Sequence, residues 1–167
     1  MESEYQPIET FESTETSNTE YAGFFMRLVA YIIDAVVLSV VLGLVLGIVA
    51  VIMGLSLEGI SEIDETAGTL VAITFAFTAG TGVIIASWMY FALMESSPRQ
   101  GTLGKMAMNI KVTDEEGGQI SFLQATGRYF ARTLLSGILF IGYIMILFTD
   151  KQQGLHDILA RCLVVRK

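Results

Sequence analysis

Two long stretches without a charged residue constrain this chain more than any other feature. Residues 35–57 form a run of 23 uncharged residues, and residues 66–94 form a run of 29. A helix needs about 20 apolar residues to cross the hydrocarbon core of a bilayer, so both runs are predicted to span a membrane. A hydrophobic fraction of 53% agrees with this prediction, because it is high for a soluble globular protein.

The first run is expected to be a resident span rather than a removable signal peptide. It is longer than a signal-peptide core, and it follows a polar segment instead of a basic leader. The chain is therefore predicted to be a multi-pass membrane protein. Its single cysteine, Cys162, excludes an intrachain disulfide and a cysteine-cluster metal site, and we expect it to pack in the interior.

The N-terminal segment 1–20 carries six glutamates and no Lys or Arg. Without it, the net charge of −7 becomes −1, from ten basic and eleven acidic residues. Such a segment has little to bury and is expected to be disordered. It serves either to solubilise or tether the protein, or to dock a basic partner.

Basic residues predict the direction in which the chain crosses the membrane. None occurs between Asp34 and Pro98, and the segment between the two runs carries four acidic residues. Because cytoplasmic loops are rich in Lys and Arg, this segment is predicted to be external and the N-terminus cytoplasmic. We expect the protein in the cell membrane of a prokaryote.

The predicted layout is a tail followed by one membrane domain over residues 21–167. That domain comprises a helix about 24–54, an acidic external loop about 55–69, a helix about 70–94, a cytoplasmic strand-turn segment about 95–120, a third membrane region about 121–149 and a cytoplasmic C-terminal segment about 150–167.

The third membrane region has two possible geometries. Its uncharged run, 133–149, has only 17 residues, and a full span would carry the basic C-terminus outside. The segment QGTLGKMAMNIKV (100–112) also resembles QGLHDILARCLVV (153–165), because each has Gln-Gly and then Ala six residues after that Gly. Like elements are expected in one environment, which favours a re-entrant hairpin turning near Ser136 and Gly137. A single short span starting near Tyr129 stays open.

Short β segments are expected outside the membrane. MNIKVTDEEGGQISF is typical of two strands around a Glu-Glu-Gly-Gly turn, and RCLVVRK of a third. The predicted fold class is therefore an all-α multi-pass membrane protein with two full transmembrane helices, a third short span or re-entrant helical hairpin, and a small cytoplasmic β segment.

Four separated motifs occur in an order that resembles the RDD family of small integral membrane proteins, named for one arginine and two aspartates. RLVAYIIDAVV supplies Arg27 and Asp34, and QGLHDILARCLVV supplies Asp157. The stretch GTLGKMAMNIKVTDEEGGQISFLQATGRYFAR is similar to the family's glycine-rich connection that ends in paired arginines, here Arg128 and Arg132. The third hydrophobic region departs from the family because it is short for two helices. The resemblance implies a multi-pass membrane protein, with transport the usual suggestion.

Arg27 and Asp34 are candidate functional residues because each places a charge on the first span. Seven residues separate them, about 20° short of two turns, so they share a helix face with Tyr31 between them. Arg27 can snorkel to the head groups, whereas Asp34 is too short to do so. The candidate partners of Asp34 are Arg27, Tyr31, Arg128 and Arg132. It is either half of a structural Asp–Arg pair, or a carboxylate that titrates or contacts a cation.

His156 and Asp157 form a second candidate site near the C-terminus. Asp157 is expected to cap a short helix or to pair with a basic residue. A lone histidine beside a carboxylate is a weak indication of proton handling. The sequence has no nucleophile motif, metal-ligand spacing or phosphate-binding glycine loop, so we expect no enzyme activity, cofactor or metal.

Small residues at four-residue spacing predict helix-packing faces. They are Ser39, Gly43 and Gly47 on the first span, and Ala76 and Gly80 on the second. These faces fit either contact between the two spans of one chain or a seam between chains. Since two spans and a short hairpin enclose little volume, a permeation path is expected to need a homo-oligomer.

These features predict an integral membrane protein that moves a small solute or ion as a homo-oligomer. Asp34 would be the intramembrane polar site, with Arg27, Arg128 and Arg132 setting its charge state. The expected partners are the lipid bilayer, further copies of the chain and a small ion or solute, but not nucleic acid. The alternative is a non-transporting scaffold or assembly factor whose charges are structural and whose tail and β segment recruit partners.

Overall fold

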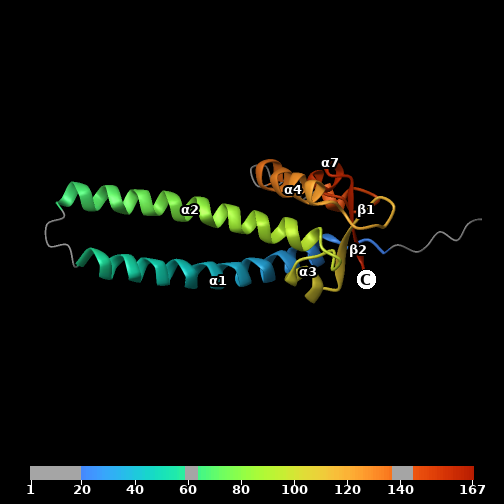
Figure 1. The fold of residues 1–167 in the computed structure, drawn as a ribbon. Helices are drawn as coiled ribbons and strands as arrows, with labels where there is room; N and C mark the ends of the chain where they lie inside the picture. The colour runs from blue at the N-terminus through green and yellow to red at the C-terminus, as the bar shows by residue number, and fades with distance from the viewer. Residues whose placement is uncertain (1–19, 59–63, 137–144) are drawn as a thin grey trace, which may run out of the picture.

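The structure is a computed structural model that describes residues 20–58, 64–136 and 145–167. Two long helices form a hairpin, and the shorter elements gather at the end where the first helix begins and the C-terminus lies (Figure 1). We call this end the polar end. The predicted acidic tail and the middle of the predicted external loop lie outside the described residues, except for Glu20.

The two hairpin helices are long enough to cross a bilayer. Helix α1 (Phe24–Glu58) has 35 residues and α2 (Glu65–Glu95) has 31, or about 52 and 46 Å at 1.5 Å per residue. Both exceed the ~30 Å hydrocarbon core and extend past their predicted bounds. Their apolar side chains point outward, with Val40 63%, Leu44 66% and Phe77 77% exposed. An apolar surface of this extent fits contact with lipid.

Local capping signals start the elements of the polar end. The Thr102 hydroxyl accepts from the Lys105 N–H to start α3, and Ser121 and Gln124 form a reciprocal capping box at the start of α4. The second of the two strands predicted in MNIKVTDEEGGQISF is wrong, because Ser121 in this segment caps the start of α4. The elements are α3 (Leu103–Ala107), β1 (Ile110–Asp114), α4 (Phe122–Ala131), the π-helix η1 (Arg132–Ser136), the 3-10 helix η2 (Met145–Leu147), α7 (Leu155–Leu159) and β2 (Cys162–Arg166).

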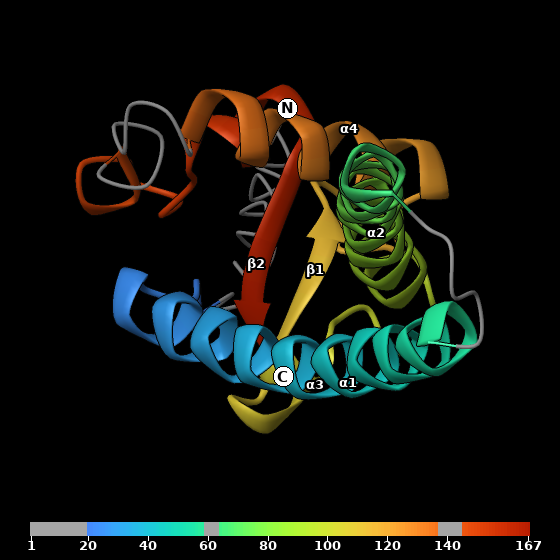
Figure 2. The same cartoon turned by 90° about the vertical axis from the view of Figure 1, so that its left-hand side faces the viewer.

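Strands β1 and β2 form an antiparallel pair with Val112 opposite Val164. The chain also pairs with the other edge of β2 just before α1, where the Ala22 N–H donates to the Val164 carbonyl at 2.9 Å. Viewed along the hairpin, the two strands lie between α1 and α4 (Figure 2). The strand expected in RCLVVRK is confirmed.

The two similar sequence segments fold alike, as short helix followed by strand. α3 and β1 match α7 and β2 at a separation of 52 residues, including the left-handed residues Gln100 and Gln152 before each helix. The sequence similarity of residues 100–112 to residues 153–165 has a spacing of 53, one residue out of register with the folded units. Val112 and Val164 occupy equivalent positions in the two units and also lie opposite each other in the sheet. The two units are therefore related by a local two-fold axis. The prediction that they share one environment is confirmed.

The buried core joins this sheet to the helices. Its apolar centre comprises Ile110, Val112, Ile120, Cys162 and Val164. Alanines from α1, α2 and α4 complete it, and their small size lets each helix approach the strands. Cys162 is buried and free, as expected from the sequence.

Only part of the third membrane region is described. α4 runs directly into η1, and the chain is described again at η2. Two helices in the described ranges are long and apolar enough to span, Phe24–Ser56 and Glu65–Glu95, and no third span is among them. The expected turn at Gly137 lies outside the described residues.

Candidate functional site

Five charged side chains from five elements meet at the polar end. We call them the charge cluster: Arg27 of α1, Glu95 of α2, Lys105 of α3, Arg128 of α4 and Asp157 of α7. They form a continuous series of ion pairs. Arg27 retains the largest exposed side-chain fraction, 9%. The cluster therefore fastens both hairpin helices to the short elements.

Asp157 is the acceptor at the centre of the cluster. One carboxylate oxygen accepts from Arg27 Nη1, and the other accepts from Arg128 Nε at 2.7 Å. The Gly154 N–H also donates to Asp157 at 3.1 Å. Both expected roles of Asp157, capping a helix and pairing with a basic residue, are thus present.

The snorkelling position predicted for Arg27 is wrong. Its Nε donates to the carbonyl of Ala22 at 2.8 Å, and its Nη2 donates to the carbonyl of Gln152 at 2.6 Å. With Nη1 on Asp157, every nitrogen of the guanidinium has a protein acceptor. The physical reason is that the C-terminal unit folds back over the start of α1 and offers these acceptors close by.

Glu95 bridges the two remaining cations. Its carboxylate accepts from Lys105 Nζ at 2.5 Å and from Arg128 Nη1 at 2.7 Å. Sequence reasoning missed Glu95 and Lys105 as site residues. The only signal was weak: a carboxylate directly after an apolar run, with a lysine ten residues later.

Asp34 occupies a separate niche with neutral donors. Its carboxylate accepts from the Tyr90 hydroxyl at 2.8 Å, the Thr102 hydroxyl at 2.5 Å and the Gly104 N–H at 2.8 Å. The predicted ion pair with an arginine is therefore wrong, as is a hydrogen bond with Tyr31. The start of α3 packs on α1 and supplies the donors before an arginine can reach the carboxylate.

Gly104 makes this close approach possible. A Cβ atom at this position would lie 2.0 Å from the Ala30 carbonyl oxygen and 2.9 Å from Asp34 Cγ. Only glycine fits between α3 and α1 here. The sequence signal was the GTLGK stretch, in which a capping threonine and this glycine are two residues apart.

The arginines of the cluster keep Asp157 ionised, and burial keeps His156 neutral. Burial opposes ionisation of Asp157, but Arg128 and Arg27 outweigh it and hold the pKa of that carboxyl well below its usual range. Burial lowers the pKa of His156 to about 3, against the attraction of Asp157. Burial, with help from Arg128, lowers the pKa of Lys105 to about 8 despite its pairing with Glu95.

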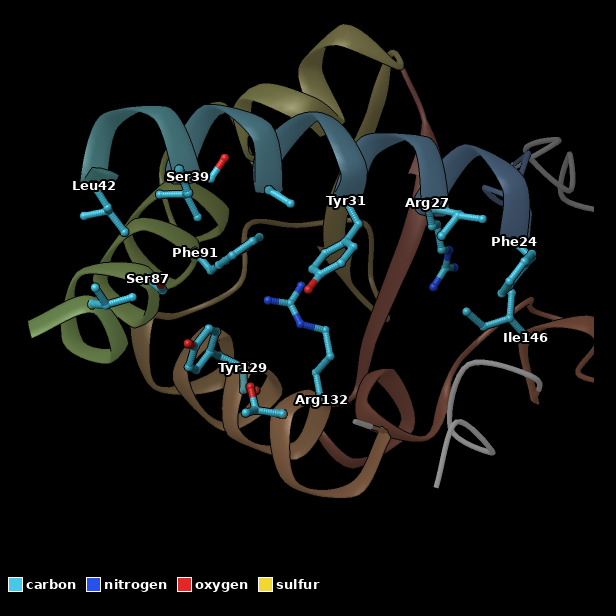
Figure 3. A pocket seen from close by; sticks show the side chains of 15 residues that line it. Phe24, Arg27, Tyr31, Ser39, Leu42, Ser87, Phe91, Tyr129, Arg132 and Ile146 are labelled. Atoms are coloured by element: carbon cyan, nitrogen blue, oxygen red, sulfur yellow. The ribbon is translucent and has the colours of Figure 1, made fainter. Parts of the chain in front are cut away.

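Arg132 differs from the other arginines of the site. Its guanidinium lies 4.1 Å from the centre of the Phe91 ring, with the Tyr129 and Tyr31 rings at 5.6 and 5.8 Å. Figure 3 shows Arg132 pointing toward Tyr31 across a cavity. No carboxylate of the described residues forms an ion pair with it.

Two cavities adjoin these residues. The small cavity, about 30 Å³, is large enough for one water molecule. It is lined by Arg27, Tyr31, Asp34, Lys105, Arg128, Arg132 and His156, among others. Of the predicted polar-site residues, only Asp157 lies outside its lining, one ion pair away. The large cavity, about 840 Å³, lies between α1, α2, α4 and η1.

The predicted helix-packing residues do not join the two spans at their glycines. A Cβ atom at Gly43, Gly47 or Gly80 would meet no atom within 4 Å, so each faces open space in the single chain. Ser39 lines the large cavity, and Ala76 is exposed. Among the described residues, contact at these glycines within one chain is therefore absent, and a seam between chains stays a prediction. Within the described ranges, no group of three or more His, Cys, Asp or Glu could hold a metal ion.

Comparison with known proteins agrees with the motifs of this site. Residues 21–161 match the RDD family, a range that contains Arg27, Asp34 and Asp157. Uncharacterized protein YxaI of Bacillus subtilis (strain 168) is 40% identical over 149 residues, which is 87% of this chain and 97% of that protein. Uncharacterized membrane protein YteJ of the same organism is 27% identical over 172 residues, covering 99% and 93%. No solved structure is significantly similar.

Proposed function

Since this chain belongs to the RDD family of membrane proteins, we propose that it moves a small ion or solute across the cell membrane as a homo-oligomer. The observation that carries the proposal is the small cavity at the end of the spans, whose lining contains Asp34 and four cationic side chains. Ionisable groups at membrane depth are costly, and they commonly mark ion or solute pathways. Here they surround a space the size of one water molecule.

Movement of α3 would give a solute access to Asp34. The carboxylate is 1% exposed, and two of its three donors come from the start of α3. This helix has five residues, so a small displacement would uncover Asp34 without unfolding either span. Arg27, Arg128 and Arg132 would act through the shared cavity rather than through direct ion pairs.

The proposal places the N-terminus and the polar end on the cytoplasmic side. It is supported by the distribution of basic residues, because none lies between Asp34 and Pro98 and the far end of the hairpin therefore carries none. The oligomer is part of the same proposal. Its support is that one hairpin leaves Gly43, Gly47 and Gly80 uncovered.

Flux measurements on reconstituted protein test this function. Purified full-length chain in lipid vesicles should carry at least one member of a panel of monovalent ions, protons and small polar solutes faster than empty vesicles. Vesicles with the same amount of an unrelated membrane protein control for leakage caused by reconstitution. No flux above both controls across the panel would refute transport.

A scaffold function is the second candidate. It is favoured by the complete pairing of the charge cluster, in which each carboxylate contacts two cations. Such a series of ion pairs holds the elements of the polar end in one arrangement. A scaffold should capture specific proteins through its acidic tail and β segment. Removal of residues 1–19 should then abolish that capture and leave the melting temperature unchanged.

A further inference from the structure

We propose that the large cavity binds an anionic phospholipid, with its phosphate on Arg132 and an acyl chain along the groove between α1 and α2. This inference goes beyond transport, because it concerns the large cavity and is tested by lipid binding, although Arg132 lines both cavities. No carboxylate of the described residues forms an ion pair with Arg132. The volume of the large cavity, about 840 Å³, is within the range of roughly 300–1,000 Å³ that is usual for ligand sites.

The charge of the site selects an anion. Arg132 is stacked among three aromatic rings, which fix its guanidinium. Its N–H donors have no hydrogen-bond acceptor among the described residues. None of the described residues lining the cavity is acidic. A guanidinium binds phosphate through two parallel hydrogen bonds, so a phosphate group meets its unfilled donors. Arg132 also begins the π-helical turn η1, and such turns are frequent at functional sites.

The shape and position of the cavity select a lipid rather than a free anion. Its lining on α1 extends from Phe24 to Leu42, which is about 27 Å along the helix. The end beyond Tyr31 is mostly apolar, with Leu38 and Leu42 on α1 and Val83 on α2. Figure 3 shows Leu42 at this end. A cation at the polar end of a groove between two spans matches the arrangement by which basic pockets hold lipid head groups.

Lipid binding to the purified full-length chain in detergent tests the proposal. We would titrate phosphatidylglycerol, with phosphatidylcholine as the uncharged comparison, and measure bound lipid by native mass spectrometry and the melting temperature. Wild type should bind phosphatidylglycerol at least tenfold more tightly than phosphatidylcholine. Arg132→Gln should lose that preference. Arg99→Gln should keep it, because this substitution removes the same charge from an exposed loop away from the cavity.

A second variant protects the test against misfolding of Arg132→Gln. Ala35→Phe fills the groove while every charge stays, and it should weaken binding of both lipids. Equal binding of phosphatidylglycerol by wild type and Arg132→Gln would overturn the proposal. Full competition by millimolar inorganic phosphate would also overturn it, since the site would then take a free anion. So would a melting temperature that depends on protein concentration and not on lipid, since a second copy would then fill the cavity.

Discussion

Arg27 and Asp157 lie 130 positions apart in the chain and form a buried ion pair. Arg27 belongs to the first span and Asp157 to α7, so the pair fastens the start of the membrane hairpin to the C-terminal helix-strand unit. Arg128 shares the same carboxylate from α4. Of the arginine and two aspartates that name the family, two therefore pair with each other, and Asp34 is held apart by neutral donors.

Asp157→Asn should severely destabilise the fold. It removes the negative charge between Arg27 and Arg128 and leaves two buried guanidiniums partly unpaired, at a cost of about 3–5 kcal/mol. The free energy of unfolding in a detergent titration measures this. Glu20→Gln breaks the exposed pair with Arg166 and should cost less than about 1 kcal/mol. Similar costs for both variants would contradict a structural role for the cluster.

Gly104→Ala should separate α3 from α1. The added methyl would meet the Ala30 carbonyl, so the helix must shift, with a loss of about 2 kcal/mol or more of stability. Gly127→Ala is the matched control, because its Cβ meets nothing within 4 Å and it lies inside α4. That change should be neutral or stabilising by up to about 1 kcal/mol. The melting temperatures of the two variants should move in opposite directions, or only that of Gly104→Ala should fall.

Acidification should destabilise the protein through His156. The unfolded chain takes up a proton near pH 6.5, whereas the folded chain does so only near its pKa of about 3, so protons favour the unfolded state in between. From pH 7 to pH 5, the free energy of unfolding should fall by about 2 kcal/mol because of His156. Unfolding curves at several pH values give the slope. His156→Gln should flatten it, and an unchanged slope in that variant would assign the effect to other groups.

Cysteines at Val112 and Val164 should form a disulfide across the two strands. These residues are directly opposite in the antiparallel pair, in a position without mutual backbone hydrogen bonds, where Cα atoms are about 4.5 Å apart. The variant is made with Cys162→Ser, and oxidation should lower its mass by two hydrogens. Cysteines at Thr113 and Val164 are one residue out of register and should stay reduced. Crosslinking of the second pair alone would refute the observed register.

Hydropathy predicted the two spans well because lipid-facing helices obey a simple rule of length and polarity. The similarity of residues 100–112 to residues 153–165 also indicated that the segments around β1 and β2 share an environment, although the register was one residue out. The reason is that Gln100 corresponds to Gln152, which takes the same left-handed conformation, and not to Gln153 beside the glycine.

The partners of Asp34 were beyond prediction from the sequence. Tyr90 is 56 positions away on α2, and Thr102 is 68 positions away at the start of α3, so the carboxylate meets them only when both elements lie against α1. Charge complementarity pointed to an arginine instead. Hydroxyl groups and a backbone N–H carry no such signal, and the glycine that permits the docking is informative only once α3 is in place.

The neutral environment of Asp34 makes its replacement a clean test. In Asp34→Asn, the remaining oxygen can still accept from Tyr90 and Gly104, and the new amide can donate to the Thr102 hydroxyl. The variant should therefore fold with a melting temperature near that of wild type, unlike Asp157→Asn. It loses only the negative charge at the small cavity.

The most direct test of the proposed function is the flux of whichever solute the wild type carries, compared with that of Asp34→Asn in matched vesicles. We expect Asp34→Asn to be folded, reconstituted to the same level and at least tenfold slower in carrying the solute. Unchanged flux through well-folded Asp34→Asn would contradict a path that uses this carboxylate.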